Sequence, residues 1–369
     1  MKKLLFFTLI ELKSADGITK KILYQKNALE ELGYNVYLMN VIPNDNTSNS
    51  ICIDNEVIKT YNVKFKWSIN LNIFKDVFEF VVKNKIEYIY VRYTHFASPS
   101  INKLFSELKK RGIKIILEIP TYPYDNEFKG FKPKIYLYYD KIWRHFLAKN
   151  LAYIVTFDQS DSIWGCPTIK IKNGIDFNHI KLKEKTKPIN DRVELIAVAT
   201  IAFWHGFDRI IEGIKIYNNS EGKKNDVHLN IVGGGDIKNL VSLADKYNLK
   251  DYVTFHGPKY GKELDDLFEI SDLAIGSLGR HRSGITNLCS LKNVEYAARG
   301  IPFIYSEVNV DFDKAVFVKK IAPDETPVNI QELIEWRKKF NMEPGKIRNS
   351  IISSLSWKKQ MELVCSHFD

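Results

Sequence analysis

Short apolar runs alternate with longer amphipathic stretches from the N-terminus onward. In the first half of the chain, the apolar runs that predict strands cover residues 4–10, 35–39, 88–91, 113–119 and 153–156. The amphipathic stretches that predict helices cover residues 18–32, 71–84, 101–111 and 134–149. Such an alternation is typical of a parallel sheet with helices on both faces, so we predict a doubly wound α/β domain.

Residues 172–192 interrupt this pattern, because they are polar, lysine-rich and contain Pro188, as linkers often are. A second alternation then begins, and its predicted strands cover residues 195–199, 229–232, 252–255 and 273–275. A chain of 369 residues also exceeds what one hydrophobic core usually organises. We therefore predict an N-terminal domain at 1–167, a C-terminal domain at 168–350, and a helical segment at 351–369 that packs back on the N-terminal domain.

The formal net charge of +10 favours an anionic partner, such as a membrane surface or a phosphorylated substrate, although a lysine-rich composition alone gives the same excess. No recognised motif for nucleic-acid binding accompanies the charge, so we expect no nucleic-acid partner. The four cysteines lack the spacing of metal ligands, and no run of about 18 apolar residues occurs. The apolar N-terminal run is short and ends at Glu11 and Lys13, so we expect a strand rather than a signal peptide, in a cytoplasmic protein.

The segment from Gly276 to Ile304 is the most informative part of the chain. It is predicted to form a basic loop, a short helix that ends at Gly300, and a buried strand. Lys292 and Glu295 are three residues apart and therefore share one helix face. A cation for a diphosphate and a carboxylate for ribose hydroxyls would suit a nucleotide sugar, and the alternative is a surface helix with a salt bridge.

Several segments, taken in chain order, resemble the retaining glycosyltransferases of family 4, which have the GT-B fold. The matching segments are residues 152–176, 196–211 with Trp204-His205-Gly206, 229–236 with its glycine turn, 253–274, and 287–300. Asn287, Glu295 and Gly300 occupy the family's Glu-x7-Glu motif and its glycine. Residues 92–93 and 118–127 resemble a subgroup found in bacterial surface-polysaccharide biosynthesis.

The resemblance implies an α/β GT-B fold, with two Rossmann-like, doubly wound parallel-sheet domains facing a cleft. It implies transfer of a sugar from a nucleotide diphosphate sugar, with retention of configuration, to a saccharide or lipid-linked oligosaccharide in cell-surface polysaccharide assembly. It also implies no metal and no cofactor beyond the nucleotide sugar itself, because GT-B enzymes usually neutralise the leaving diphosphate with protein groups.

Two departures from the family pattern affect the expected chemistry. Asn287 replaces the first glutamate of the motif, so we expect it to orient the donor sugar by hydrogen bonds without supplying a negative charge. His205 takes the place of a lysine after the first strand of the donor domain, and an arginine usual there is missing. These departures leave two alternatives: a non-catalytic GT-B subunit that partners another transferase, and a GT-B nucleotide-sugar epimerase.

The resemblance and the residue chemistry together give a set of candidate site residues. The expected donor-binding residues are Gly17, His205, Gly206, Arg209, Gly234, Arg280, Arg282, Lys292 and Glu295, and among the arginines Arg282 is preferred for the diphosphate. The expected catalytic residues are Asn287, Glu118 and Glu127, and the expected acceptor-binding residues are Tyr122, Tyr124 and Asp125. Glu118 is expected at the mouth of the cleft. A purely structural role is the alternative for each acceptor-side residue.

The predicted helix at residues 134–149 interleaves aromatic and basic side chains. Such a helix could lie on an anionic bilayer, which would place the protein peripherally on the inner face of the plasma membrane. The alternative is a helix whose aromatic residues pack inside its own domain.

Overall fold

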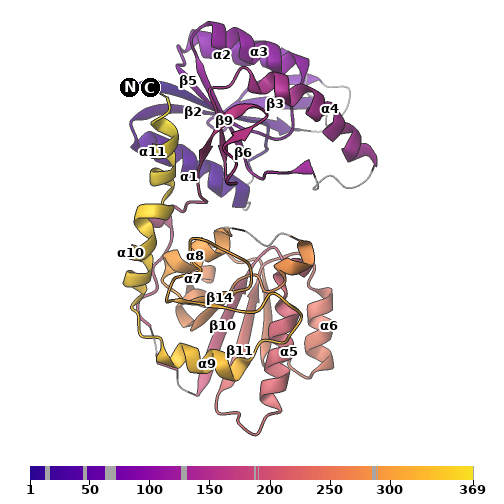
Figure 1. The fold of residues 1–369 in the computed structure, drawn as a ribbon, viewed down its shortest axis with the longest axis vertical. Coiled ribbons are helices and arrows are strands. Elements are labelled where there is room, and N and C mark those ends of the chain that lie inside the picture. Colours follow the sequence, from indigo (N-terminus) through magenta and orange to yellow (C-terminus); the bar gives the residue numbers. More distant parts are fainter. Residues whose placement is uncertain are drawn as a thin grey trace. The chain divides into compact units, whose positions relative to one another are not determined.

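The computed structural model of the chain describes residues 1–12, 17–44, 48–62, 72–125, 131–186, 188–189, 191–284, 288 and 290–368. The chain divides into two compact units (Figure 1). Unit 1 comprises Met1–Lys172 and Trp357–Asp369, and unit 2 comprises Asn173–Ser356. No helix among the described residues is long and apolar enough to cross a membrane.

Unit 1 is built on a sheet with the order β4-β3-β2-β1-β5-β6-β7-β9-β8. Its parallel strands are β1 (Lys2–Thr8), β2 (Tyr34–Pro43), β5 (Tyr88–Arg92), β6 (Lys114–Ile119), β7 (Tyr153–Thr156) and β9 (Cys166–Lys170). Its antiparallel edge strands are β3 (Ser48–Ile53), β4 (Glu56–Asn62) and β8 (Ser162–Ile163). Its helices are α1 (Gly17–Glu31), α2 (Asn72–Lys83), α3 (Pro99–Lys110), α4 (Phe131–Ala148) and α11 (Trp357–Cys365).

Alternate residues of the unit 1 strands enter two different cores, as a sheet covered on both faces requires. Leu5 and Phe7 of β1 pack with residues of α2, α3 and α4. Leu4 and Phe6 pack on the opposite face with residues of α1 and α11, among them Trp357. The C-terminal helix α11 is therefore part of the core of unit 1, although it follows unit 2 in the sequence.

Unit 2 contains a six-stranded parallel sheet with the order β12-β11-β10-β13-β14-β15, which is the strand order of a Rossmann domain. Its strands are β10 (Arg192–Val198), β11 (Asp226–Val232), β12 (Val253–Gly257), β13 (Leu273–Ile275), β14 (Phe303–Tyr305) and β15 (Val318–Lys320). Its α-helices are α5 (Phe207–Asn218), α6 (Lys238–Lys246), α7 (Gly261–Ile270), α8 (Leu291–Arg299), α9 (Ile330–Lys339) and α10 (Pro344–Leu355). Two 3₁₀ turns, η3 (Phe203–His205) and η4 (Arg280–Ser283), follow β10 and β13.

The helices of unit 2 cover both faces of this sheet. Leu195 of β10 packs on one face with residues of α5, α6 and α9, whereas its neighbour Ile196 packs on the other face with residues of α7, α8 and α10. Two Rossmann-like α/β units with parallel central strands confirm the predicted fold class. The sequence patterns did not predict the β3–β4 hairpin, the short strand β15 or helix α10.

Candidate functional site

The point where the chain changes sides of the unit 2 sheet lies between β10 and β13. These two strands are neighbours, but α5 follows β10 on one face and α8 follows β13 on the opposite face. In open α/β sheets, ligands bind outside the carboxyl ends of the strands at such a switch point. The loops that follow β10, β13 and β14 therefore define the candidate site.

Close backbone packing joins two of these loops. Gly206 has a φ of +63°, and a Cβ added to it would lie 2.6 Å from the backbone nitrogen of Gly279. The amide of Leu278 also donates to the carbonyl of His205 at 2.8 Å. A side chain at position 206 would separate the loops, so Gly206 acts through backbone packing. Gly234, also expected at the donor, has ordinary space around it, with a side-chain carbon of Pro258 at 3.6 Å from an added Cβ.

His205 is buried and neutral. Its Nδ1 accepts a hydrogen bond from the amide of Ala202 at 3.0 Å, which requires the tautomer with the proton on Nε2. Burial, followed by the charges of Lys292 and Arg280, lowers the pKa of His205 to about 2. The expected interaction of a protonated His205 with phosphate is therefore not supported, and the side chain contributes at most a neutral donor.

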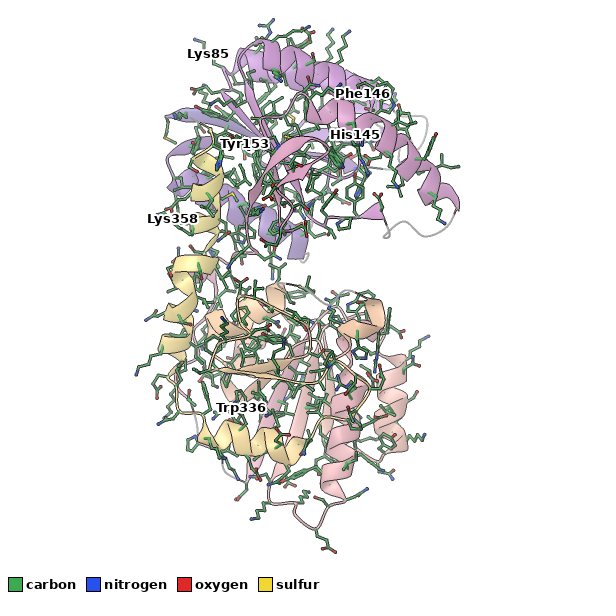
Figure 2. All side chains as sticks on the ribbon, in the orientation of Figure 1. Lys85, His145, Phe146, Tyr153, Trp336 and Lys358 are labelled. Carbon is green, nitrogen blue, oxygen red and sulfur yellow. The ribbon has the colours of Figure 1, made fainter. Side chains whose placement is uncertain are left out.

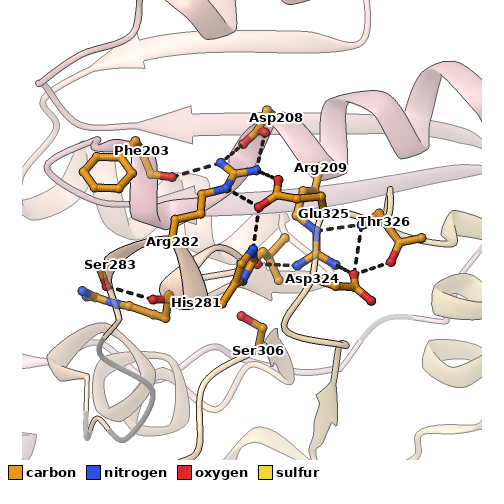
Figure 3. Close-up of polar contacts among 12 residues, drawn as sticks. Phe203, Asp208, Arg209, His281, Arg282, Ser283, Ser306, Asp324, Glu325 and Thr326 are labelled. Atoms are coloured by element: carbon orange, nitrogen blue, oxygen red, sulfur yellow. Dashed lines mark hydrogen bonds and ion pairs between the residues drawn. The ribbon is translucent and has the colours of Figure 1, made fainter.

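Arg282 is fully occupied by protein acceptors (Figure 3). Its Nη1 and Nη2 donate to the two carboxylate oxygens of Asp208 at 2.9 and 2.7 Å, and its Nε donates to Glu325 at 2.9 Å. Further bonds reach the carbonyl of Phe203 at 3.1 Å and the second oxygen of Glu325. A guanidinium has five N–H donors, so none is left for a phosphate. The structure thus overturns the preference for Arg282 as the diphosphate clamp.

Arg209 is only 1% exposed and also serves the protein itself (Figure 3). Its Nε donates to the carbonyl of Thr326 at 2.8 Å, its Nη2 pairs with Asp324 at 3.2 Å, and its Nη1 donates to the carbonyl of Leu278. These bonds fix the loop after β13 to the segment after β15. Arg209 therefore has a structural role in holding these loops together, and its donors are not available to a ligand.

Lys292 and Arg280 remain as the two cations without a carboxylate partner within the described part of this site. The Nζ of Lys292 lies 3.3 Å from the hydroxyl oxygen of Ser277 and 5.9 Å from the ring centre of Phe207. The guanidinium of Arg280 lies 5.8 Å from the ring centre of Trp204, and its Nε has no hydrogen-bond partner among the described residues. Both side chains are partly buried, and partly buried cations without a carboxylate at ion-pair distance are suited to receive an anion.

The electrostatics of the two cations agree with this assignment. Burial lowers the pKa of Arg280 and also that of Lys292, which falls to about 7 with a further contribution from Arg280. An entering anion would favour the charged form of both groups.

Glu295 lies one helical turn after Lys292 on α8 and is partly exposed. Its Oε1 accepts from Arg299 at 2.9 Å, and Arg299 also pairs with Asp265 at 2.6 Å. The salt bridge expected as the alternative is therefore present. An ion-paired, partly exposed carboxylate still has lone pairs free to accept a hydroxyl.

Sequence reasoning missed Asn293 and Glu307, which lie beside Lys292. Asn293 is completely buried and donates from Nδ2 to the Oε1 of Glu307 at 3.0 Å. Glu307 follows the buried strand β14 by two residues. A carboxylate directly after a fully buried parallel strand was the signal that would have identified it, since that position is at the switch-point edge of the sheet.

Glu118 in unit 1 is completely buried, so it does not lie at an open mouth as we expected. It accepts from Gln25 and Tyr90 at 2.6 Å each, pairs with Arg92, and lies 3.4 Å from Lys21. Burial alone would raise its pKa, but Lys21 and Arg92 hold that pKa below the usual range. This arrangement is a buried ion cluster that joins α1, β5 and β6.

The three residues expected to bind the acceptor make their contacts within unit 1. Tyr124 is buried and donates to Asp140 at 2.6 Å, while Asp125 accepts from Arg144 at 3.0 Å and pairs with Lys141 at 2.7 Å. Tyr122 is partly buried against the core. The contacts match the structural alternative for all three.

Gly17, Asn287 and Glu127 were also expected in the site, and no metal was expected there. Gly17 begins α1 in unit 1, and an added Cβ would meet nothing within 4 Å, so no close approach requires a glycine there. Asn287 and Glu127 lie outside the described residues. Among the residues that are described, no group of three or more His, Cys, Asp or Glu side chains could hold a metal ion.

Residues 178–326, all within unit 2, match the family model "Glycosyl transferases group 1". This part of unit 2 is thus similar to glycosyl transferases group 1, and the switch-point site lies inside the matched region. No curated protein sequence matches the chain.

Glycosyltransferases are among the solved structures that share the fold of this chain. A glycosyltransferase from Rickettsia africae has a TM-score of 0.67 at 12% identity, over 100% of this chain and 98% of that one. Anabaena Alr3699/HepE in complex with UDP has a TM-score of 0.56 at 14% identity, over 100% and 96%. WaaG, a glycosyltransferase involved in lipopolysaccharide biosynthesis, has a TM-score of 0.56 at 13% identity, over 100% and 98%. At these identities the likeness shows the GT-B fold.

Proposed function

We propose that this chain is a glycosyltransferase that uses a nucleotide diphosphate sugar, and that unit 2 binds the donor. The observation that carries the proposal is the pair of cations without carboxylate partners, Lys292 and Arg280, at the carboxyl edge of the parallel strands. The diphosphate of the donor supplies the missing negative charge. The family match over residues 178–326 and the UDP bound by Anabaena Alr3699/HepE support this choice of ligand.

We further propose retention of configuration, with Asn287 orienting the donor sugar by hydrogen bonds and no metal ion. The acceptor is a saccharide or lipid-linked oligosaccharide in cell-surface polysaccharide assembly. Support for these points is the order of family-like segments along the sequence and the involvement of the structurally similar WaaG in lipopolysaccharide biosynthesis. The enclosed ion cluster of Glu118 gives no support for its role as a catalytic base.

A panel of nucleotide sugars tests the proposal by thermal shift. A donor present at 100 times its dissociation constant should stabilise the protein by about 2.7 kcal/mol. The donor that binds is then assayed for transfer to a saccharide acceptor and for slow hydrolysis. Binding without hydrolysis or transfer would favour the non-catalytic subunit, and conversion of the donor to a second nucleotide sugar would favour the epimerase.

Activity should persist in excess chelator, because Lys292 and Arg280 take the place that a divalent cation holds in metal-dependent transferases. Turnover measured with and without chelator checks this expectation. Loss of turnover in chelator and its recovery with Mn²⁺ would contradict the metal-independent mechanism.

Replacement of Glu295 by Ala should weaken donor binding by about 1–3 kcal/mol, because a charge-assisted hydrogen bond to the ribose is lost. Asp265 keeps Arg299 paired in this variant, which limits secondary effects on α8. Calorimetry with the bound donor measures the change. An unchanged affinity would assign Glu295 to the Arg299 salt bridge alone.

We also propose that α4 places the protein on an anionic membrane surface. Ile135, Tyr138, Tyr139, Ile142 and Phe146 are exposed, and they follow the i, i+3, i+4, i+7, i+11 spacing of one helix face, here named the α4 face (Figure 2 labels Phe146). Tyr138 is 69% exposed. Lys134, Lys141 and His145 are exposed on the same helix, so the apolar face is accompanied by basic side chains.

The double variant Tyr138→Glu with Ile142→Glu should lower binding to vesicles that contain an anionic lipid by about tenfold or more, because two apolar side chains no longer enter the interface. Ile216→Glu on α5, where Ile216 is 55% exposed, is the matched control and should bind like the wild type. Sedimentation with vesicles measures binding. Equal binding by both variants would show that the α4 face does not contact the membrane.

A further inference from the structure

A buried carboxylate, that of Glu307, lies near enough to Lys292 and Arg280, the two cations of the candidate site, to interact with their charges. The side chain of Glu307 is 2% exposed, and one of its oxygens, Oε1, accepts from Asn293. The other oxygen, Oε2, is buried and has no hydrogen-bond partner among the described residues. Burial raises the pKa of Glu307, and the charges of Lys292 and Arg280 oppose that rise without either cation lying at ion-pair distance.

Hydrogen bonds link the loop that carries Glu307 to the loop whose Ser277 contacts Lys292. The amide of Ser306 donates to the carbonyl of Ser277 at 2.9 Å, and the hydroxyl of Ser277 lies 3.3 Å from the Nζ of Lys292. On the other side of Glu307, the amide of Leu288 donates to the carbonyl of Val308 at 3.0 Å. The loops after β13 and β14 and the start of α8 thus converge on the carboxylate.

Asn293 is fixed as well, so the carboxylate has little freedom. A Cβ added to Gly276 would lie 2.9 Å from the Oδ1 of Asn293 and 2.8 Å from the carbonyl oxygen of Ile304. Asn293 therefore fits closely between β13 and β14, and its amide aims Oε1 of Glu307. This precision is more than a simple surface carboxylate would need.

We propose that Glu307 is a positioning residue for the donor diphosphate, whose buried carboxylate keeps Lys292 charged and in place in the empty site without itself touching the donor. The proposal rests on the proposed function, because it assumes that Lys292 and Arg280 bind a diphosphate. It adds a carboxylate that neither the family resemblance nor the sequence patterns assigned.

Donor binding should then be coupled to uptake of a proton. In the empty site, one carboxylate faces two cations, and a diphosphate brings two further negative charges. Burial raises the pKa of Glu307. Burial lowers the pKa of Lys292 to about 7; the charge of Glu307 opposes this change, and the charge of Arg280 adds to it. The diphosphate raises both pKa values, so the pair takes up a proton from the buffer.

The other titratable groups around Lys292 do not compete for this proton near neutral pH. His205 is neutral, with its pKa lowered to about 2. Burial raises the pKa of Tyr296 and of Tyr305 well above its usual value, and the charge of Glu307 raises both further. Burial lowers the pKa of Arg280, but a guanidinium group stays protonated in proteins near neutral pH.

The sign of the pH effect follows from Lys292. Above about pH 7 the free site loses a proton that the complex keeps, so donor affinity should fall with rising pH by up to about tenfold per unit. Glu307→Gln removes the charge that supports Lys292, so the fall should begin at lower pH. Lys292→Arg stays charged throughout and should abolish the fall.

Titration calorimetry with uridine diphosphate glucose and guanosine diphosphate mannose tests the proposal between about pH 6 and pH 8.5. These probes lack the terminal phosphate monoester that titrates near pH 6, so the donor itself does not change charge in this range. Each titration is repeated in two buffers of different ionisation enthalpy, which reports proton uptake directly. Glu332→Gln, which removes an exposed carboxylate on α9, is the control and should behave as the wild type.

The outcomes separate this proposal from the proposed function. Failure of the wild type to bind either probe would overturn the proposed function, and this proposal with it. Binding by the wild type without proton uptake, or a pH profile of Glu307→Gln that coincides with that of the wild type, would overturn this proposal alone. If Glu307→Gln does not fold, the wild-type proton uptake and the flat profile expected for Lys292→Arg decide the question.

Discussion

Replacement of Lys292 by Met is expected to lower turnover with the bound nucleotide diphosphate sugar by roughly 10²–10³-fold. As the sugar departs, negative charge grows on the leaving diphosphate, and preorganised cations in a dry site stabilise that charge strongly. Lys292 meets this description because its Nζ contacts only Ser277 among described hydrogen-bond partners and has no carboxylate within ion-pair distance there. Arg280→Met should act in the same direction, because Arg280 is the other cation without a carboxylate partner.

A variant of Arg282 is the most informative comparison with the Lys292 and Arg280 variants, because the donors of Arg282 are already bound by protein acceptors. Arg282→Gln should mainly lower stability, because it leaves Asp208 and Glu325 without their shared partner. Lys262→Met, at an exposed position on α7, controls for the loss of a positive charge from unit 2. Steady-state kinetics and thermal unfolding of the four variants are compared. Full turnover by Lys292→Met would contradict the assignment of Lys292 to the diphosphate. A loss of turnover in Arg282→Gln without any loss of stability would instead assign the diphosphate to Arg282.

The difference between Arg280 and Arg282 shows where prediction from sequence ended. Both arginines lie in one basic turn, and their local sequence favours neither. The partners of Arg282 are Asp208 and Glu325, which are 74 and 43 residues away in the chain. Only the folded sheet brings these segments together, so the sequence could nominate the turn but not the free cation. For Glu307, the position after a buried strand was a usable sequence signal, but its contact with Asn293 of α8 could be known only from the fold.

The helix that carries Lys292 and Glu295 was predictable because its signals are local. Gly300 ends it with a φ of +75°, Pro302 follows, and the three-residue spacing of Lys292 and Glu295 is a property of any helix. The parallel strands were predictable for a similar reason, since each is a short buried apolar run. Local signals therefore fixed the elements, whereas the pairing of charges depended on tertiary structure.

The β3–β4 hairpin was missed because its second strand carries a weak pattern. β4 is exposed at every position except Tyr61, so its side chains show no alternation of apolar and polar residues. Its turn is made by Asp54 and Asn55, both with positive φ. Asp and Asn tolerate that region better than most residues, and this pair was the available signal.

Glu118 illustrates the opposite error, since a correct local pattern led to an incorrect environment. The glutamate was expected at the cleft mouth because it stands near the end of an apolar run. The strand itself was predicted to end at Ile119, as β6 does, but Lys21 and Gln25 of α1 cover the carboxylate. A buried carboxylate with two cations serves stability unless an opening exposes it.

Replacement of Glu118 by Ala is accordingly expected to destabilise unit 1 by about 3–5 kcal/mol, because the buried cations Arg92 and Lys21 would lose the carboxylate that they share. The lowered pKa of Glu118 adds a pH signature: its contribution is present above the ordinary carboxyl pKa and is lost as the pH falls through the lower folded value. The difference in stability between the wild type and Glu118→Ala should therefore shrink in acid.

Trp357, whose ring lies 5.2 Å from the Nζ of Lys21, is a fluorescent reporter of this region during denaturant unfolding. Glu118→Gln keeps the shape and should be intermediate. If Glu118→Gln abolished transfer while leaving the unfolding transition unchanged, the carboxylate would be a catalytic base after all, and unit 1 would have to open to expose it.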